Sequence, residues 1–402
     1  MNRLVKSLFR KKRKNEGAIK YISYLLHLWL GLLSSLIVFV VCLTGAIYAF
    51  KTQIIELYNK DKVYITYVEN QTIQTPDELR TSLKKQNKDL VSIYIPEQGN
   101  RSWIVGYKND KGESKSTYYN PYTKQELGVG NDDLSQFFSV VLSIHRNLLM
   151  GDVGRQIVGA GVLIFVFLLV SGFVLWLPKK WKYLKQNLTI KLGSKFQRLN
   201  YDFHNVAGFY AMLMLGFIAI TGLYITYPWV KNALIVSLGG ESLSNIKNDT
   251  DGKKDDAFAT LMGDMLNRQK EKTEIEPEKE VSLNHLLQTT QTHFPNSGSL
   301  TLELPNDENP RYTIRKINSD NRLGALLPDE LTFDKKGELK TKELFLDKPL
   351  NKQFTSLAKP LHTGEIMGLP SIILYFIVSF IGCLLPITGF LIWWHRLRKM
   401  KK

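Results

Sequence analysis

Four long apolar runs, none of which contains Lys, Arg, Asp or Glu, constrain the fold of this chain most strongly. Each run has at least 22 residues, whereas about 20 helical residues cross the ~30 Å hydrocarbon core of a bilayer. One such run could be a buried helix of a soluble protein, but four in one chain favour membrane spans. We therefore predict four transmembrane helices, at Tyr24–Phe50, Gln156–Leu177, Asn205–Tyr227 and Met367–Trp394.

The 402-residue chain has a net charge of +16 at pH 7, with 53 Lys and Arg against 37 Asp and Glu. The basic residues crowd three segments beside the apolar runs, within 1–23, 178–203 and 395–402. Short flanks rich in Lys and Arg stay on the cytoplasmic side of a membrane. We therefore predict a multi-pass protein in contact with membrane lipid, with both termini cytoplasmic. The charge is thus a topology signal, and we predict no nucleic-acid partner.

Two polar regions, 51–140 and 228–358, are then predicted to lie outside the cytoplasm. Each shows a helix, short strands and a turn in the same order. The first region has a helix start at Thr75-Pro76, strands at Val91–Ile95 and Trp103–Tyr107, and a turn at Asn120-Pro121. The second has a helix at Ser282–Phe294, strands at Leu300–Leu304 and Tyr312–Ile314, and a turn at Asp334–Gly337. We predict two α+β domains, the second interrupted by a mobile, polar insertion at 239–280.

Residues repeat along the chain at fixed offsets, which is the signature of an internal duplication. One set is shifted by 177 residues: His27, Gly31, Thr44 and Gly45 return as His204, Gly208, Thr221 and Gly222. A second set is shifted by 217 residues: His145, Met150, Gly151, Gly172, Phe173 and Trp176 return as His362, Met367, Gly368, Gly389, Phe390 and Trp393. The predicted fold is therefore a duplicated, polytopic α-helical membrane protein. Both copies run in the same direction, so its pseudo-twofold axis follows the membrane normal.

The four duplicated histidines are the candidate site residues, because a twofold axis along the normal places equivalent residues at equal depth. Neutral imidazole is a common metal ligand, and two facing imidazoles suit the axial positions of a haem iron that transfers electrons. We predict an inner haem held by His27 and His204 and an outer haem held by His145 and His362. In the order His27, His204, His145 and His362, these histidines belong to the segments 24–50, 204–227, 141–177 and 359–394.

Both haem groups are expected to be haem b, because the chain has no C-x-x-C-H motif and its two cysteines lie inside predicted spans. Zinc fits less well, since two imidazoles fill only half of a tetrahedral site. Glycines close to the histidines could let a flat macrocycle approach the backbone. They are Gly31, Gly208, Gly151 and Gly368.

Three further residues are secondary candidates for cofactor binding. Arg146 and Arg155 flank the outer histidine and could pair with haem propionates or equally with lipid headgroups. His395 stands in the sequence Trp393-Trp394-His395-Arg396. It reads as an interface anchor or as a contact to the inner cofactor.

The histidine segments resemble the PepSY-associated transmembrane helix family. The resemblance rests on Phe203-His204-Asn-Val-Ala-Gly208, Ile144-His145-Arg-Asn-Leu-Leu-Met-Gly151 and Leu361-His362-Thr-Gly-Glu-Ile-Met-Gly368. The stretch Tyr119–Gly128 is similar to a PepSY domain, with Lys124 where the PepSY turn more usually has glycine. The resemblance implies a bacterial inner-membrane protein, and the family includes haem-containing ferrisiderophore reductases. It also implies a ferric siderophore or other ferric chelate as acceptor outside the cytoplasm.

Three function classes stay open at this point. The first is a haem-dependent oxidoreductase that passes electrons across the membrane. No nucleotide-binding motif is present, so its donor is a protein, a diffusible carrier or a quinol. The second is a non-redox PepSY module that binds or restrains a peptidase or other partner. A haem transporter is a third reading, and the sequence does not choose the acceptor, the donor or the oligomeric state.

Overall fold

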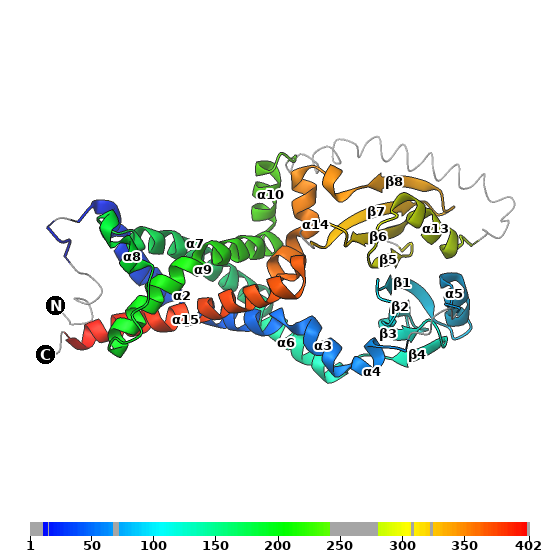
Figure 1. Cartoon of the computed structure of the whole chain (residues 1–402), viewed down its shortest axis with the longest axis horizontal. Coiled ribbons are helices and arrows are strands. Elements are labelled where there is room, and N and C mark those ends of the chain that lie inside the picture. The colour runs from blue at the N-terminus through cyan, green and yellow to red at the C-terminus, as the bar shows by residue number, and fades with distance from the viewer. Residues whose placement is uncertain are drawn as a thin grey trace. The chain divides into compact units, whose positions relative to one another are not determined.

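The computed structural model describes residues 11–14, 16–66, 72–241, 280–306, 309–321 and 325–399. The chain divides into two compact units (Figure 1). We call them the membrane unit, made of Met1–Ile55, Asp132–Pro228 and Ala358–Lys402, and the sheet unit, made of Glu56–Asn131 and Trp229–Leu357. Nearly all of the predicted insertion at 239–280 lies outside the described residues.

The four predicted spans are present as four helices long and apolar enough to cross a membrane. They are α2 (Ala18–Ala49), α7 (Gly151–Trp176), α9 (Phe196–Thr226) and α15 (Leu369–Lys399). Helices α2 and α9 begin about two turns before the predicted spans, because their polar first turns continue the helix. His27 and His204 therefore lie inside these helices rather than at their first residues.

The four long helices form a ring in which α2 and α9 each pack against both α7 and α15. Helices related by the duplication thus occupy opposite corners of the bundle. Its centre is filled by small and apolar side chains, among them Val38, Phe165, Ala211, Leu215 and Val378. This arrangement leaves α2 and α9 facing each other across the bundle.

Two shorter helices precede α7 and α15 and carry the other two histidines. Helix α6 (Asp132–Asn147) holds His145, and α14 (Leu350–Thr363) holds His362. The turn after α6 has Leu148 and Leu149 at φ values of 51° and 61°, whereas the turn after α14 has Gly364 at 82°. A leucine in this left-handed region is strained by about 1–2 kcal/mol, so the first copy holds the same reversal with less suitable residues.

Apart from the two helices that pack on the sheet, the remaining described helices are short connections. They are α3 (Lys51–Tyr58), α4 (Lys60–Val63), α8 (Leu184–Asn187), α10 (Pro228–Ser237) and the 3-10 turns η1 (Trp181–Tyr183), η2 (Phe345–Asp347) and η3 (Glu365–Met367).

The sheet unit contains one antiparallel sheet of eight strands in the order β4-β3-β2-β1-β5-β6-β7-β8. The first copy supplies β1 (Asp89–Ile95), β2 (Trp103–Lys108), β3 (Ser114–Asn120) and β4 (Gln125–Gly128). The second supplies β5 (Leu300–Glu303), β6 (Tyr312–Asn318), β7 (Leu327–Phe333) and β8 (Leu339–Glu343).

The two predicted α+β domains share this sheet and one hydrophobic core. Strands β1 and β5 pair in the middle, with Ile93 opposite Leu302. Helices α5 (Pro76–Lys84) and α13 (Leu283–His293) contribute Leu79 and Leu286 to the same core as the strand residues. The physical reason is that each four-stranded half would otherwise expose β1 or β5 as an unpaired edge.

The local signals read from the sequence agree with these elements. Thr75 and Glu78 form the reciprocal capping box that starts α5. Lys124 has φ 61°, and the corresponding hairpin of the second copy places Gly337 at φ 81°. The first copy thus holds a lysine in the backbone conformation that glycine adopts without strain.

Candidate functional site

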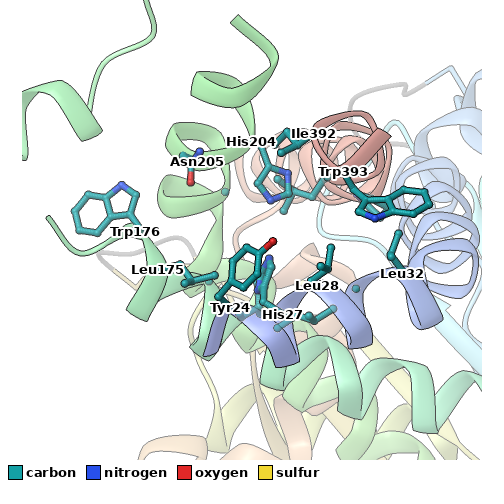
Figure 2. Close-up of a pocket in the computed structure, with 18 of the residues that line it drawn as sticks. Tyr24, His27, Leu28, Leu32, Leu175, Trp176, His204, Asn205, Ile392 and Trp393 are labelled. Atoms are coloured by element: carbon teal, nitrogen blue, oxygen red, sulfur yellow. The ribbon is translucent and has the colours of Figure 1, made fainter. Parts of the chain in front are cut away.

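The inner site is a pair of imidazoles that reach toward each other from opposite corners of the bundle. His27 comes from α2 and His204 from α9, and Figure 2 shows both among the residues that line one cavity. Their ring centroids are 6.3 Å apart and their planes are nearly perpendicular, at 88°. Two metal–imidazole bonds of about 2 Å each would set facing ring centroids roughly 6 Å apart, so the spacing suits one bridging metal ion.

Each inner ring is held by a hydroxyl of the neighbouring helix. The Nδ1 atom of His27 lies 3.0 Å from Ser171 Oγ on α7, and that of His204 lies 2.9 Å from Thr388 Oγ1 on α15. Both hydroxyl groups donate their own proton to a backbone carbonyl, those of Leu168 and Leu384. The hydroxyl oxygen therefore accepts a hydrogen bond from Nδ1–H, which fixes this tautomer.

The outer site repeats the arrangement with the two short helices. The ring centroids of His145 and His362 are 6.2 Å apart, with an interplanar angle of 51°. Thr44 Oγ1 and Thr221 Oγ1 each lie 3.1 Å from the Nδ1 atom of one ring, of His145 and His362 respectively.

Backbone carbonyls complete the outer contacts and determine the proton position directly. The Nδ1 atoms of His145 and His362 lie 3.0 Å from Val41 O and 3.1 Å from Ile218 O. A carbonyl can only accept, so Nδ1 carries the proton and Nε2 carries the lone pair. Metal-binding histidines generally donate their other ring N–H in this way, which orients the ring.

Burial keeps the outer imidazoles neutral. It lowers the pKa of His362 to about 4, with His145 as a further cause, and it also lowers the pKa of His145. A neutral ring is required for metal binding. The outer pair therefore has the protonation state that a metal ligand needs at neutral pH.

A glycine follows each of the four hydroxyl residues and makes room for the imidazole ring. A Cβ atom added at these glycines would lie 2.9–3.3 Å from a histidine Cε1 atom. The contacts are Gly172 with His27, Gly389 with His204, Gly45 with His145 and Gly222 with His362. Each ring is thus seated on a Ser/Thr-Gly pair, in which the hydroxyl binds Nδ1 and the glycine gives space.

Sequence reasoning missed the role of these pairs, although most of the signal was present. Thr44-Gly45 and Thr221-Gly222 repeat at the 177-residue offset, and Gly172 and Gly389 repeat at the 217-residue offset. Ser171 and Thr388 stand at the same offset but differ in type, so they were not counted as a repeat. Their contact to histidine is decided by helix packing over 144 and 184 residues of chain.

The inner pair opens onto a cavity of about 590 Å³. This volume is within the usual range for small-molecule and cofactor sites, about 300–1,000 Å³. Its walls are largely apolar and aromatic, including Phe165, Phe209 and Trp393 (Figure 2 labels Trp393). A flat apolar macrocycle fits such a lining.

The four glycines predicted to admit a macrocycle fall into two groups. Gly31 and Gly208 line the inner cavity. Gly151 and Gly368 lie in turns at φ 57° and 66°, and no side chain among the described residues comes within 4 Å of an added Cβ atom. Gly151 and Gly368 therefore allow the chain to reverse direction after the outer histidines, and they do not make a close packing contact.

The secondary candidates differ in their surroundings. Arg155 donates from Nη2 to Thr226 O at 2.9 Å, and its Nε is buried without a hydrogen-bond partner among the described residues. Arg146 is exposed. The ring of His395 packs against Phe196 with centroids 6.3 Å apart, and this residue is absent from the cavity lining.

The two sites lie at different depths of the same bundle. On α2, His27 belongs to the inner site and Thr44 touches the outer one, a separation of about 26 Å along the helix axis. Within the part of the chain that the structure describes, no group of three or more His, Cys, Asp or Glu could hold a metal ion. Each site therefore supplies two nitrogen ligands, which suits an iron whose other four ligands come from a macrocycle.

The fold and these sites define a four-span helical membrane protein with a histidine pair at each end of its bundle and with an α+β unit formed by Glu56–Asn131 and Trp229–Leu357. The chain belongs to the family described as PepSY-associated TM region, whose model matches residues 24–396. No curated protein matches the chain.

Proposed function

We propose that this protein carries two haem b groups and passes electrons across the membrane to an acceptor outside the cytoplasm. The observation that supports this most directly is the fourfold repeat of one arrangement: an imidazole with Nδ1–H bound to a neighbouring helix and Nε2 left as the metal-binding nitrogen. Two such rings face each other at each site. His27 and His204 would hold the inner haem, and His145 and His362 the outer one.

Bound haem would supply a one-electron iron couple, which the side chains of this chain do not provide. The protein contributes the rest. Two imidazoles at each site would ligate the iron, which would favour electron transfer over oxygen binding. Its apolar helices line the inner cavity, and its hydroxyl groups keep each ring in the ligating tautomer.

The acceptor class is a ferric siderophore or another ferric chelate, and this part of the proposal rests on the family resemblance. The basic segments 178–203 and 395–402 support a cytoplasmic location for the inner site. A bacterial inner membrane is the setting that follows. The donor is then a cytoplasmic or membrane-bound reductant, such as a quinol.

A visible spectrum of protein purified from haem-replete cells tests the cofactor. We expect two haem b groups per chain with low-spin, bis-imidazole bands. A haem-free preparation would contradict the proposal and favour the non-redox PepSY module. Loss of haem to an acceptor during turnover would indicate a haem transporter.

The direction of transfer is tested in vesicles that contain a reductant and face a ferric chelate outside. We expect external Fe(II) to form, as measured with a ferrous-specific dye. The matched control is His362→Ala, which keeps the inner ligands but interrupts the path at the outer site. Equal Fe(II) formation by this variant would overturn the two-site path.

A further inference from the structure

We propose that the mouth of the inner cavity is a binding site for the two carboxylates of a tetrapyrrole. This inference rests on the proposed function, because it specifies which end of the cavity receives the acidic edge of the haem. The site is formed by Lys20 and Arg396, oriented by Tyr24 and assisted by Arg13.

The cationic residues lie at one level, beyond the imidazoles. On α2, Lys20, Tyr24 and His27 follow at spacings of four and three residues, which places them on one face of the helix. Lys20 is seven residues from His27, about 10 Å along the axis. On α15, Arg396 is likewise seven residues beyond Gly389, against which the His204 ring packs. The two carboxylate arms of a tetrapyrrole extend from one edge of the ring. Cationic groups gathered at one level of the cavity can therefore bind both arms.

The charges at this level suit a dianion. Among the residues that the structure describes, the ionisable ones that line the cavity besides the histidines and tyrosines are Arg13, Lys20, Arg396 and Glu16. Three cations and one carboxylate leave a net charge of +2. The rest of the lining is dominated by apolar and aromatic residues, so an acidic ligand gains its charge contacts at this end.

Local contacts orient both cationic groups. Arg396 Nη1 donates to Tyr24 Oη, and the guanidinium lies 5.6 Å from the Tyr24 ring centroid. Lys20 Nζ donates to Leu177 O at 2.8 Å. A guanidinium has five N–H donors and an ammonium has three, so each can bind a carboxylate while it holds such a contact. A neutral quinol headgroup would gain little from two cations, which makes a carboxylated ligand the better match.

The test compares haem with its dimethyl ester, which keeps the iron and the ring but lacks both negative charges. Apoprotein carrying His362→Ala, so that only the inner pair is intact, is titrated with either compound, and Kd is read from the absorbance of the bound form. A charge-assisted hydrogen bond contributes enough that the ester should bind about ten- to a hundredfold more weakly. In the Lys20→Gln/Arg396→Gln variant, the two affinities should become similar.

Two further variants keep the result interpretable. Arg398→Gln removes an exposed cation two residues away, which lies over Trp394 at 5.4 Å, and should preserve the discrimination. Lys20→Arg/Arg396→Lys should preserve it as well. Equal binding of haem and ester by the parent protein would overturn the carboxylate site and leave the proposed function standing. Failure of both compounds to bind would instead count against the proposed function.

Discussion

The residues that distinguish this bundle are the hydroxyl groups as much as the histidines. Each of the four imidazoles donates from Nδ1 toward a Ser or Thr of a neighbouring helix, at 2.9–3.1 Å. A histidine alone at a helix end is usually an interfacial polar residue. Four histidines with the same kind of orienting partner support the proposed ligand roles, because the partner fixes both the ring direction and the free nitrogen.

Removing one of these hydroxyls should weaken one site and leave the other intact. Thr388→Val keeps the side-chain shape but removes the acceptor for His204 Nδ1–H. Loss of such an orienting partner typically lowers metal affinity by about 10–100-fold. We expect inner-site haem affinity to fall by this amount and its midpoint potential to shift, as measured by haem titration and potentiometry. Thr388→Ser is the control and should behave as the parent, whereas unchanged affinity in Thr388→Val would show that the hydroxyl is incidental.

The pairing of ligands predicts which substitutions act on the same haem. His204→Ala removes one inner ligand, so the inner haem should become high-spin or be lost. Adding His27→Ala should then cost less than the two single losses summed, because both residues act on one iron. Low-temperature electron paramagnetic resonance and haem quantification would follow both sites. The pairing is wrong if His27→Ala and His145→Ala remove the same haem while His204→Ala is harmless.

Among the secondary-structure elements, helix α5 of the first copy and helix α13 of the second copy are joined by hydrogen bonds. Asp77 in the first turn of α5 accepts hydrogen bonds from Ser282 Oγ and from the Leu283 and Asn284 N–H groups at the start of α13. It also forms an ion pair with Arg80 at 2.9 Å. One carboxylate thus caps the helix of the other copy, in addition to the cap that Ser282 provides.

This cap predicts a pH-dependent stability of the sheet unit. Burial by itself raises the pKa of Asp77, but the Ser282 hydroxyl, the two backbone N–H groups and Arg80 lower it below its ordinary value. The stabilisation is therefore present above the unfolded pKa, about 3.9, and is lost as pH falls through the folded pKa. Asp77→Asn should destabilise the unit by about 1 kcal/mol at pH 7 and by less at pH 2–3.

Hydrogen exchange of the β1 and β5 amides in the full-length protein measures this effect. Asp110→Asn, an exposed aspartate in the β2–β3 loop, is the matched control and should leave the exchange rates unchanged. Identical pH dependence in Asp77→Asn and the parent protein would show that the cap does not contribute.

For the whole molecule, the duplication accounts for the structure of both units, because equivalent elements of the two copies pair within each unit. In the membrane unit, equivalent helices face each other across the bundle and present equivalent histidines. In the sheet unit, the first strands of the two copies pair with each other. Each copy therefore completes a site or a sheet that it could not form alone.

The orientation of the chain in the membrane is tested by cysteine labelling. In a background with Cys42 and Cys383 replaced by alanine, Lys111→Cys and Lys185→Cys place exposed thiols in the sheet unit and in the basic loop. An impermeant maleimide should label Lys111→Cys on intact spheroplasts and Lys185→Cys only after permeabilisation. Labelling of both from one side would contradict the charge-based orientation and the proposed direction of electron transfer.

The sequence by itself determined the four spans, the duplication and the four candidate histidines, because these are properties of composition, length and spacing along one chain. It also predicted the cap at Thr75 and strands β1, β2, β5 and β6, whose signals are local. Strands β3, β4, β7 and β8 were not predicted, since they are short or rich in polar residues and rely on pairing with their neighbours.

Only the tertiary structure decided what each histidine touches and how the two α+β regions combine. The bonds from His27 to Ser171 and from His204 to Thr388 join helices far apart in the chain, so the helix ring had to form before their hydroxyls could be recognised. The pairing of β1 with β5 likewise joins strands about 200 residues apart, and neither strand carries a local mark of its partner. The spacing of residues within a helix or strand can be read directly from the sequence, whereas contacts between elements depend on how their surfaces pack.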